Sequence, residues 1–581
     1  MKLFCLAIVL TFSTLGVSAP KVLKYSEDGT PTNMDPVQSA TLYSNKIVTA
    51  VYDTLYEYKY LKVPYELKPR LATGFPEVSK DGKTYTFKLR KGVRFIDDAC
   101  FKGGKGREVT AQDFVYSIKR HFDPKNRSQG AWLWTGKIVG LDDWKAKGAN
   151  YKKEVAGLKA LDKHTVQVTV TKPFPQLLYT FEMGFSGVVP HEAVKKYGKE
   201  LAIHPVGSGP FKLAGHNSKQ TVLVKNKNYR KEIFDPVAEG YDPKIHGGTG
   251  IGKLKGKRLP IVDRVEVNWM KDVVPRWNSF TKGDEIVWAV VQNEYIDQVL
   301  ASKQPVKLKP DYAKKYNYRV ATEAGFVYNN FNMDHPKLGH STDKKQNAAN
   351  KALRCAIRKS FSWPQRVDRF YLGIGEAYPG VIPPGVDGYD EKLPKESITQ
   401  DIVGAKQLLK DYGWNKKNLP KIVYPAVAQV RSKQFFEQFR GNLSKIGYPK
   451  SKIRYKSYAT FGDFSRAIKN RKTDLVPMAW GLDYPDAENT LGLFYGPNSS
   501  PGSNSGNYTN PEYDALFVKA AQMMPSKERT ELYKKLNKII IDDCATISGF
   551  SRTRIYVWHK NVAIWPQRDF VSNVFKYVDV N

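Results

Sequence analysis

The sequence predicts a large α/β protein whose domains are built from discontinuous segments of the chain. Apolar residues make up 41% and aromatic residues 13% of its 581 residues, which is enough to fill a sizeable core and excludes intrinsic disorder. Strand and helix patterns alternate along the chain, and no linker breaks it cleanly. No internal repeat is apparent, and neither a collagen period nor a sustained heptad pattern occurs.

The N-terminus predicts export. Met1 and Lys2 give a short positive region, Leu3 to Leu15 is mostly apolar, and Gly16 to Ala19 offers the small residues of a cleavage site. We expect a signal peptide over residues 1–19 and a soluble mature protein outside the cytoplasm. The alternative is a membrane anchor, but the apolar run is shorter than the roughly 20 residues a spanning helix needs. Cys5 lies inside the run, so no lipid anchor is expected.

Alternating and helical patterns mark the elements of the first half. Thr84 to Arg90 alternates apolar and polar residues after a turn, which is typical of a half-buried strand. Thr110 to Asp113 resembles a capping box, so we expect a helix there with Phe114, Val115 and Ile118 on its inner face. Alternating valines predict further strands around positions 166–170, 222–224 and 265–267.

The second half is richer in helix. Ala348 to Phe361 places small and apolar residues on one face and Lys351, Arg354 and Arg358 on the other. Similar stripes predict four more helices, at Ile402 to Tyr412, Ser432 to Ile446, Pro511 to Gln522 and Lys527 to Ile541. Strands are expected at Lys452 to Tyr458 and Asp474 to Trp480.

Three cysteines remain in the expected mature chain, namely Cys100, Cys355 and Cys544. Export would allow one pair to oxidise, and the odd count leaves one thiol over. Three cysteines do not make a disulfide scaffold, so we interpret them as small buried apolar side chains. The sequence does not decide whether any two of them pair.

Signatures of catalysis, metals and cofactors are weak. Gly247 to Lys253 matches most of a phosphate-binding loop, but Leu254 stands where Ser or Thr would bind Mg²⁺. His335 and His340 are five apart, so they do not share a helix face, and no metal site or cofactor is expected. Asp483 and Asp486 resemble the acid/base pair of a glycosidase, which keeps a secreted hydrolase open as an alternative.

The chain carries 92 Lys and Arg against 57 Asp and Glu, a net charge of +35. The excess is diffuse, and its densest stretches are Lys416 to Lys456 and Lys244 to Arg258. Aromatic residues do not interleave with these charges as a stacking platform for single-stranded nucleic acid requires. We therefore expect solvated helix faces and no nucleic-acid partner. A basic envelope-surface protein that binds anionic polymers is a further alternative.

A series of stretches in order resembles the family 5 solute-binding proteins of bacterial ABC importers, which include oligopeptide- and dipeptide-binding proteins. The resemblance spans nearly the whole mature chain. It rests on these segments: Met34 to Pro36, Tyr52 to Leu55, Leu71 to Phe75, Asp81 to Phe95, Thr110 to Ser117, Val206 to Phe211, Ala348 to Phe361, Ala405 to Trp414, Trp480 to Asp486 and Asn510 to Leu516.

The resemblance implies a two-lobed periplasmic-binding-protein fold of the cluster C type, with an additional small domain and two hinge segments. By analogy, residues 20–65, 198–323 and 551–581 would build lobe I, and residues 324–550 would build lobe II. The small domain would cover residues 66–197 and pack on lobe I. Phe326 to Asn332 and Arg552 to Trp558 are the hinge strands that this analogy implies.

The resemblance also implies a binding site between the lobes. An extended peptide would add to exposed backbone at Ala40, Thr41 and Leu42 of lobe I and at Ala479 to Asp483 of lobe II. The aspartate that holds the peptide amino group in the family matches Asp483, because a buried ammonium needs a partner. The remaining expected ligand-binding residues are Trp480, Gly481, Leu482 and Tyr484 beside it, and Tyr328 on a hinge strand. A loop-capping role for Asp483 and a core role for Trp480 are the alternatives.

We therefore expect a periplasmic, monomeric protein without enzyme activity that passes a peptide to the permease of an ABC transporter. Some stretches depart from the family pattern, including the Phe101 to Arg107 insert, the Lys244 to Arg258 loop and Arg358 to Ser360. These departures leave open a nonpeptide ligand such as a sugar, haem or a metal chelate, which also occur in the family.

Overall fold

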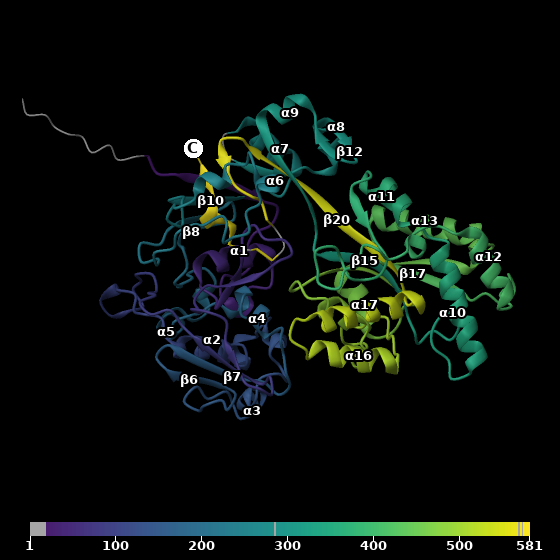
Figure 1. Ribbon diagram of the computed structural model, residues 1–581, viewed down its shortest axis with the longest axis horizontal. Helices are drawn as coiled ribbons and strands as arrows, with labels where there is room; N and C mark the ends of the chain where they lie inside the picture. The colour runs from purple at the N-terminus through teal and green to yellow at the C-terminus, as the bar shows by residue number, and fades with distance from the viewer. Residues whose placement is uncertain (1–18, 284–285, 568–569, 572, 581) are drawn as a thin grey trace, which may run out of the picture.

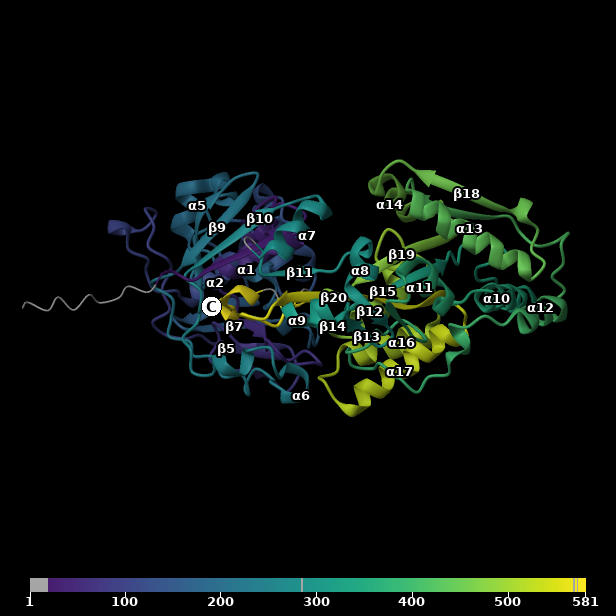
Figure 2. The ribbon, with the colours of Figure 1, turned by 90° about the horizontal axis from the view of Figure 1, so that it is seen from above.

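The computed structural model describes residues 19–283, 286–567, 570–571 and 573–580. The expected signal peptide therefore lies outside the described residues, apart from Ala19. Two bodies lie side by side, and the long strand β20 (Thr546–His559) runs between them (Figure 1; seen from above in Figure 2). We use the names lobe I, small domain and lobe II for the residue ranges given above; the boundaries themselves stay a prediction.

Lobe I is built around a four-stranded sheet in the order β1-β10-β9-β8. Its strands are β1 (Val22–Glu27), β10 (Arg264–Trp269), β9 (Gln220–Lys225) and β8 (Phe211–His216). β1 and β10 run parallel, and the other pairs are antiparallel. The N-terminal end of helix α1 (Leu42–Val51) lies next to the other body, and Thr41 caps it by accepting a hydrogen bond from the Ser44 amide at 3.1 Å.

The small domain has its own four-stranded antiparallel sheet, β4-β5-β7-β6. Its strands are β4 (Glu77–Val78), β5 (Thr84–Lys88), β7 (Thr165–Thr169) and β6 (Leu158–Asp162). Helix α2 (Ala111–Arg120) packs on β6 and β7 and begins with the expected capping box between Thr110 and Asp113. Phe114, Val115 and Ile118 are buried as predicted, because they form the apolar face that covers the sheet.

A third sheet joins the two bodies, in the order β11-β20-β15-β19. Its other strands are β11 (Trp288–Val290), β15 (Gly325–Phe331) and β19 (Leu475–Gly481), and β14 (Tyr316–Thr322) and β16 (Gly375–Ala377) also pair with β20. Residues 546–550 of β20 pair with β15, whereas residues 553–559 pair with β14. One strand therefore belongs to both bodies.

The chain crosses between the bodies around residues 322–325 and 550–553. Residues 327–330 of the expected hinge strand Phe326 to Asn332 are paired with β19 on one side and β20 on the other, and Arg552 to Trp558 lie on β20, so the hinge assignment stays a prediction. At the crossing, the Ser551 hydroxyl donates to the Gly325 carbonyl, and Glu323 pairs with Arg552 at 2.9 Å and Arg554 at 2.6 Å.

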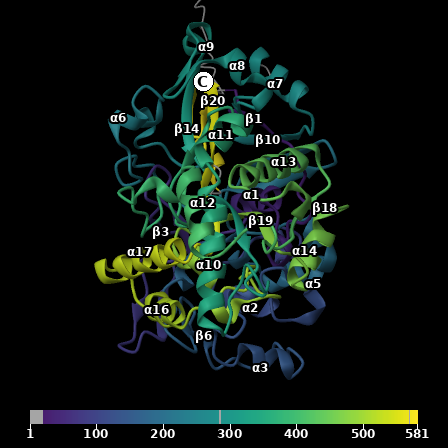
Figure 3. The same ribbon diagram turned by 90° about the vertical axis from the view of Figure 1, so that its right-hand side faces the viewer.

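Helices surround the lobe II part of this sheet (Figure 3). They are α10 (Lys344–Lys359), α11 (Trp363–Tyr371), α12 (Ile402–Asp411), α13 (Val430–Lys445), α14 (Phe461–Lys469), α15 (Glu488–Leu491), α16 (Pro511–Ala521) and α17 (Lys527–Asp542). A parallel pair of strands, β17 (Ile422–Val427) and β18 (Ile453–Tyr458), lies beside α13 and α14. Each of the predicted second-half helices and strands is confirmed to within four residues at its ends.

The remaining α-helices and strands are short and lie in lobe I and the small domain. They are β2 (Tyr56–Tyr58), β3 (Leu67–Pro69), α3 (Leu141–Ala146), α4 (Leu177–Thr180), α5 (His191–Tyr197), α6 (Pro243–His246), α7 (Val273–Lys282), α8 (Ile296–Val299), β12 (Leu300–Lys303), β13 (Val306–Leu308), α9 (Pro310–Lys315), β21 (Val562–Ala563) and β22 (Asp579–Val580). Among the described helices, none is long and apolar enough to cross a membrane.

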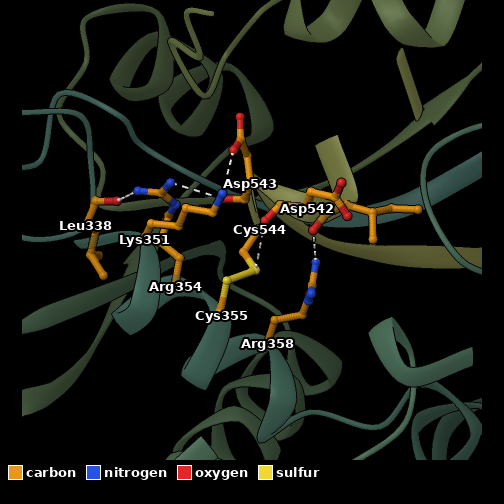
Figure 4. Close-up of a disulfide and its surroundings, with 9 residues drawn as sticks. Leu338, Lys351, Arg354, Cys355, Arg358, Asp542, Asp543 and Cys544 are labelled. Atoms are coloured by element: carbon orange, nitrogen blue, oxygen red, sulfur yellow. Dashed lines mark hydrogen bonds and ion pairs between the residues drawn. A yellow bond between two sulfur atoms is a disulfide. The ribbon is translucent and has the colours of Figure 1, made fainter. Parts of the chain in front are cut away.

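A disulfide between Cys355 and Cys544 ties α10 to the residues that follow α17 (Figure 4). The sequence left open whether any two of the mature cysteines pair; these two do, while Cys100 is half-buried and lies outside a disulfide. Arg354 corrects the predicted polar face of α10. Its side chain is buried, because it donates to the carbonyls of Leu338 at 2.7 Å and Asp543 at 3.0 Å.

Candidate ligand-binding site

The outer edge of β19 is open. β19 is the last strand of its sheet, and within the described residues no strand is hydrogen-bonded to its far side. The Leu482 amide donates to the Ala324 carbonyl at 3.0 Å, so residues 480 and 482 face β15. Along a strand, the N–H and C=O groups of successive residues point to alternate sides, so Ala479 and Gly481 direct these groups to the open edge. Both residues are exposed. Pro477 lies two residues before Ala479 and faces the same edge, but as a proline it has no main-chain N–H group.

A cleft of about 360 Å³ lies between this edge and lobe I. Leu42 at the start of α1 forms the lobe I side, and its side chain is 58% exposed. The lobe II side and the crossing supply Glu323, Ala324, Gly325, Phe326, Val327, Trp480, Gly481, Leu482, Arg552 and Arg554. The structure thus brings four predicted site residues together, namely Leu42, Trp480, Gly481 and Leu482. Ala40 is exposed and Thr41 caps α1, and neither lines this cleft.

Asp483 follows the open edge and is held in place by Asn489. The Asn489 amide nitrogen donates to the Asp483 carboxylate at 3.1 Å, and its oxygen accepts from the Asp483 amide at 3.2 Å. Burial raises the pKa of the Asp483 carboxyl, and the positive charge of Lys137 in the small domain offsets only part of this effect. Within the part of the chain that the structure describes, no cation forms an ion pair with it. A fixed carboxylate without a counter-ion therefore follows Leu482, the last residue of the cleft wall, although Asp483 itself does not line the cleft.

Trp480 and Tyr484 lie on either side of Asp483 in the chain, but only Trp480 lines the cleft. The Trp480 indole donates to the Asn489 oxygen at 2.9 Å and its side chain is half-buried on the cleft wall. Tyr484 is buried and does not line the cleft, and its hydroxyl donates to Glu488 at 2.6 Å. Its ring stacks on Tyr179 of the small domain, with centroids 5.7 Å apart. Tyr484 therefore contacts the opposite body directly.

Asp486 belongs to a buried network that fixes the loop carrying Asp483. Its carboxylate is paired with Arg529 at 3.1 Å and accepts from the Tyr533 hydroxyl at 2.8 Å. Both charged side chains are at most 2% exposed. Asp486 is thus engaged inside lobe II and does not face Asp483 as the second carboxylate of a hydrolase would.

Tyr328 lies on β15 and is buried, with its pKa raised by burial. It does not line the cleft. It lines a second cavity of about 510 Å³ inside lobe II, which also contacts Pro477, Met478 and Ala479 of β19. The two cavities share Val327 and Arg552 in their walls, so they are neighbours along the same strand edge.

The site also contains residues that the sequence did not predict as ligand-binding, namely Lys137, Tyr179, Asn489, Arg552 and Arg554. Lys137 and Tyr179 come from the small domain, more than 300 positions before Asp483 in the chain. No local pattern reports such proximity, because it depends on how the two bodies pack. Asn489 lies six residues after Asp483, and a polar residue following the loop was the one local signal available.

Comparison with known proteins identifies the family of the chain. The family model for bacterial extracellular solute-binding proteins, family 5 (middle region), matches residues 66–502. The dipeptide-binding protein of Escherichia coli (strain K12) is 26% identical over 93% of this chain and 91% of that protein. Heme-binding protein A of Haemophilus influenzae is 24% identical, covering 84% of this chain and 79% of that protein.

Among solved structures, the periplasmic binding protein DppA from Helicobacter pylori, in complex with the peptide STSA, has the same fold. It superposes with a TM-score of 0.68 at 23% identity and covers 96% of this chain and 98% of that chain. The architecture described above is therefore the two-lobed periplasmic-binding-protein fold. Because the family model covers well over half of the chain, the protein belongs to the family 5 bacterial extracellular solute-binding proteins.

Proposed function

We propose that the protein captures a peptide in the cleft between its two bodies and delivers it to the permease of an ABC transporter. One observation carries the proposal: the exposed main-chain edge at Ala479 and Gly481 lies directly before Asp483, a fixed carboxylate without a counter-ion. This combination matches the two invariant parts of a peptide, its backbone and its amino group.

The bound peptide lies extended along β19 and forms hydrogen bonds with the main chain of Ala479 and Gly481. Its α-ammonium group pairs with Asp483. Main-chain hydrogen bonds do not depend on the peptide sequence, so the strand edge gives affinity without selecting side chains. The adjoining cavities, about 360 and 510 Å³ in volume, leave room for side chains.

Two of the relatives support a peptide ligand. The Escherichia coli relative is a dipeptide-binding protein, and the Helicobacter pylori protein of the same fold was solved with a peptide bound. The Helicobacter pylori protein is also associated with an ABC transporter, which supports the permease as partner. We further propose that the protein acts as a periplasmic monomer exported by residues 1–19 and that it is not an enzyme.

Native mass spectrometry of protein exported and purified without refolding tests the proposal. Extra masses of peptide size that are released on denaturation and can be sequenced would support it. Incubation of those peptides with a high concentration of the protein should leave them intact. Steady cleavage would instead support the secreted hydrolase.

The alternative in the same transport role is a nonpeptide solute, and the haem-binding relative is the observation that favours it. The two ligands are distinguished by absorption spectroscopy and competition. A bound haem would give an intense visible band that peptides do not displace. Absence of that band together with displacement by peptides of the native ligand would exclude haem.

The stack of Tyr179 on Tyr484 predicts that closure of the two bodies contributes to affinity. An aromatic pair contributes about 0.5–1.5 kcal/mol beyond the area it buries. If the ligand-bound state is the closed one, Tyr179→Ala should weaken peptide binding about two- to tenfold. Isothermal titration calorimetry measures the affinity, and Tyr179→Phe, which keeps the ring, is the matched control. Equal affinities for the alanine and phenylalanine variants would contradict the prediction.

The raised pKa of Asp483 predicts that peptide binding releases a proton. Burial favours the protonated carboxyl in the free protein, whereas the ammonium group of the peptide favours the carboxylate. The pKa therefore falls on binding, and affinity should decrease as the pH is lowered through the pKa of Asp483 in the free protein. Calorimetry in two buffers of different ionisation enthalpy measures the proton release. Asp483→Asn should abolish the part of the release that comes from this group.

A further inference from the structure

The part of lobe II around β18 carries a cluster of exposed cations. β18 lies at the outer edge of this lobe in both Figure 2 and Figure 3. We use the name basic edge for the exposed cations on β18 and on the segments that lead into β17 and β18, namely Lys416, Lys417, Lys421, Lys450, Arg454 and Lys456. Within the described chain, none of them forms an ion pair with a carboxylate.

The parallel pairing of β17 with β18 brings these cations together. Ile422 is paired with Ile453, so the segments that lead into the two strands lie side by side. The Lys452 side chain joins the segments, because it donates to the carbonyls of Lys417 at 2.9 Å and Leu419 at 2.7 Å. Cations from two separate stretches of the chain therefore share one edge of the lobe.

The carboxylates on the neighbouring elements are engaged elsewhere. Helices α13 and α14 pack against β17 and β18, and β19 packs against β17. Glu437 of α13 pairs with Arg440 at 2.5 Å, and Asp463 of α14 lies 3.5 Å from Arg466. Asp474, which directly precedes β19, accepts from the Val423 amide at 2.8 Å. The positive charges of the basic edge therefore have no counter-ion among these groups.

The opposite side of lobe II is also rich in lysine, but its charges are balanced. Helices α16 and α17 lie on that side in Figure 2 and Figure 3. Lysines there are paired with acidic side chains, at 2.8 Å for Lys519 and Glu528, 2.8 Å for Lys534 and Glu531, 3.0 Å for Lys535 and Glu512, and 2.6 Å for Lys538 and Asp542. Like charges without counter-ions repel one another and destabilise the compact state. The basic edge therefore does not serve the fold, and its charge fits an anionic partner outside the chain.

The rings beside the basic edge distinguish between anionic partners. Tyr455 packs on Phe436 with the ring centroids 5.1 Å apart, and Tyr458 packs on Phe464 at 5.7 Å. Their faces are thus used inside the lobe, whereas a site for single-stranded nucleic acid offers aromatic faces on which bases stack. Clusters of about four to eight Lys and Arg side chains bind bilayers that contain anionic lipids, and they need no aromatic platform.

We propose that the basic edge is a docking surface for a bilayer that contains anionic phospholipids. The Lys and Arg head groups face the lipid phosphates from the water side, so the protein is held at the membrane surface without inserting into it. The choice of a bilayer as partner rests on the proposed delivery of a ligand to a membrane permease. The surface itself rests on the charge distribution, and its binding does not require a peptide in the cleft.

Co-sedimentation with lipid vesicles tests the proposal, with the exported protein purified without refolding and no peptide added. Vesicles of phosphatidylcholine that contain about one third phosphatidylglycerol are compared with vesicles of phosphatidylcholine alone. We expect binding to the anionic vesicles only. This binding should be lost when salt is raised from about 50 to 500 mM, because salt screens the attraction between exposed charges.

Two quadruple variants locate the binding. The first removes cations of the basic edge by Lys421→Gln, Lys450→Gln, Arg454→Gln and Lys456→Gln. The matched control removes the same number of positive charges from the opposite side of the lobe, by Lys519→Gln, Lys534→Gln, Lys535→Gln and Lys538→Gln. The first should weaken binding to anionic vesicles at least about thirtyfold, because each basic side chain near such a surface contributes about fivefold. The control should weaken it less than about threefold, since its charges face away.

A smaller variant keeps the test decisive. Arg454→Gln combined with Lys456→Gln changes two exposed side chains of β18 and should weaken binding at least about fivefold. It replaces the quadruple variant of the basic edge if circular dichroism shows that the latter does not fold.

Each contrary outcome has its own meaning. Equal weakening by the two quadruple variants would assign the binding to the net charge of the whole chain and overturn the docking surface. Absence of binding to anionic vesicles, or binding that persists at high salt, would overturn it as well. Tighter binding of the wild type to single-stranded DNA than to anionic vesicles at the same salt would assign the basic edge to nucleic acid instead. None of these results touches the capture of a peptide, which native mass spectrometry tests separately.

Discussion

Replacing Cys355 and Cys544 together by alanine is expected to lower the free energy of unfolding by about 2–5 kcal/mol. The bond joins residues 189 positions apart, with a Cα–Cα distance of 5.2 Å. A cross-link that closes such a long loop removes many conformations from the unfolded chain, so its loss should stabilise the unfolded state. In the folded state it holds α10 against the end of α17, next to the start of β20 (Figure 4).

Urea unfolding of the oxidised protein and the double variant, followed by circular dichroism, measures this effect. The midpoint should fall in the double variant, and reducing agent should shift the wild type in the same direction. Cys100→Ala is the matched control, because Cys100 lies outside the disulfide. Coincident unfolding curves for the wild type and the double variant under oxidising conditions would contradict the prediction.

Local elements could be predicted from the sequence because their signals are local. The apolar stripe of Lys527 to Ile541 corresponds to α17, whose N-cap Ser526 accepts from the Arg529 amide at 3.2 Å. The capping box at Thr110 is present for the same reason, since its two partners are three residues apart. These patterns fix where an element begins and which face it buries, and nothing farther along the chain is needed.

The features that were missed depend on contacts between distant segments. The helical pattern places Arg354 on the polar face of α10. In the structure its side chain donates hydrogen bonds to the carbonyls of Leu338 and Asp543. The pairing of Cys355 with Cys544 has the same cause. Periodicity predicts that a face is polar, but it does not predict whether water or another segment satisfies that face.

The candidate site also combines residues that could be predicted from the sequence with residues that could not. The stretch from Trp480 to Leu482, which the resemblance implied as ligand-binding, lies on the cleft wall at the end of β19. Ala40 and Thr41 do not line the cleft, because Thr41 turns inward to cap α1 and Leu42 is the residue that projects across. Lys137 and Tyr179 come from the small domain, so only the packing of the two bodies places them near Asp483 and Tyr484.

Asp483→Ala is expected to weaken peptide binding by roughly 2–5 kcal/mol, or about 30-fold to several-thousand-fold. The ammonium group of a bound peptide would lose the carboxylate proposed to pair with it while remaining in the closed cleft. Asn489 is already positioned by the Trp480 indole, so the carboxylate is held ready before the peptide arrives. Little rearrangement is then needed on binding, which makes the loss on truncation large.

Calorimetry on folded variants separates the charge of Asp483 from its shape. Asp483→Asn keeps the size of the side chain and its contact with Asn489, so a loss of affinity close to that of the alanine variant would assign the effect to charge. Glu531→Gln, which removes a carboxylate that is 68% exposed on α17, is the matched control and should bind as the wild type does. An unchanged affinity of Asp483→Ala would remove the assignment of Asp483 to the amino group.

A thermodynamic cycle that combines a change of Asp483 with a change of the peptide shows which group Asp483 recognises. Acetylation of the peptide amino group removes the ammonium, and it should weaken binding to the wild type about as much as Asp483→Asn weakens binding of the free peptide. The two changes should not add, because each deletes one member of the same pair. If acetylation weakened binding to Asp483→Asn as strongly as to the wild type, the ammonium would have another partner. Glu488, which begins α15 and whose pKa is raised by burial, would be the next carboxylate to change.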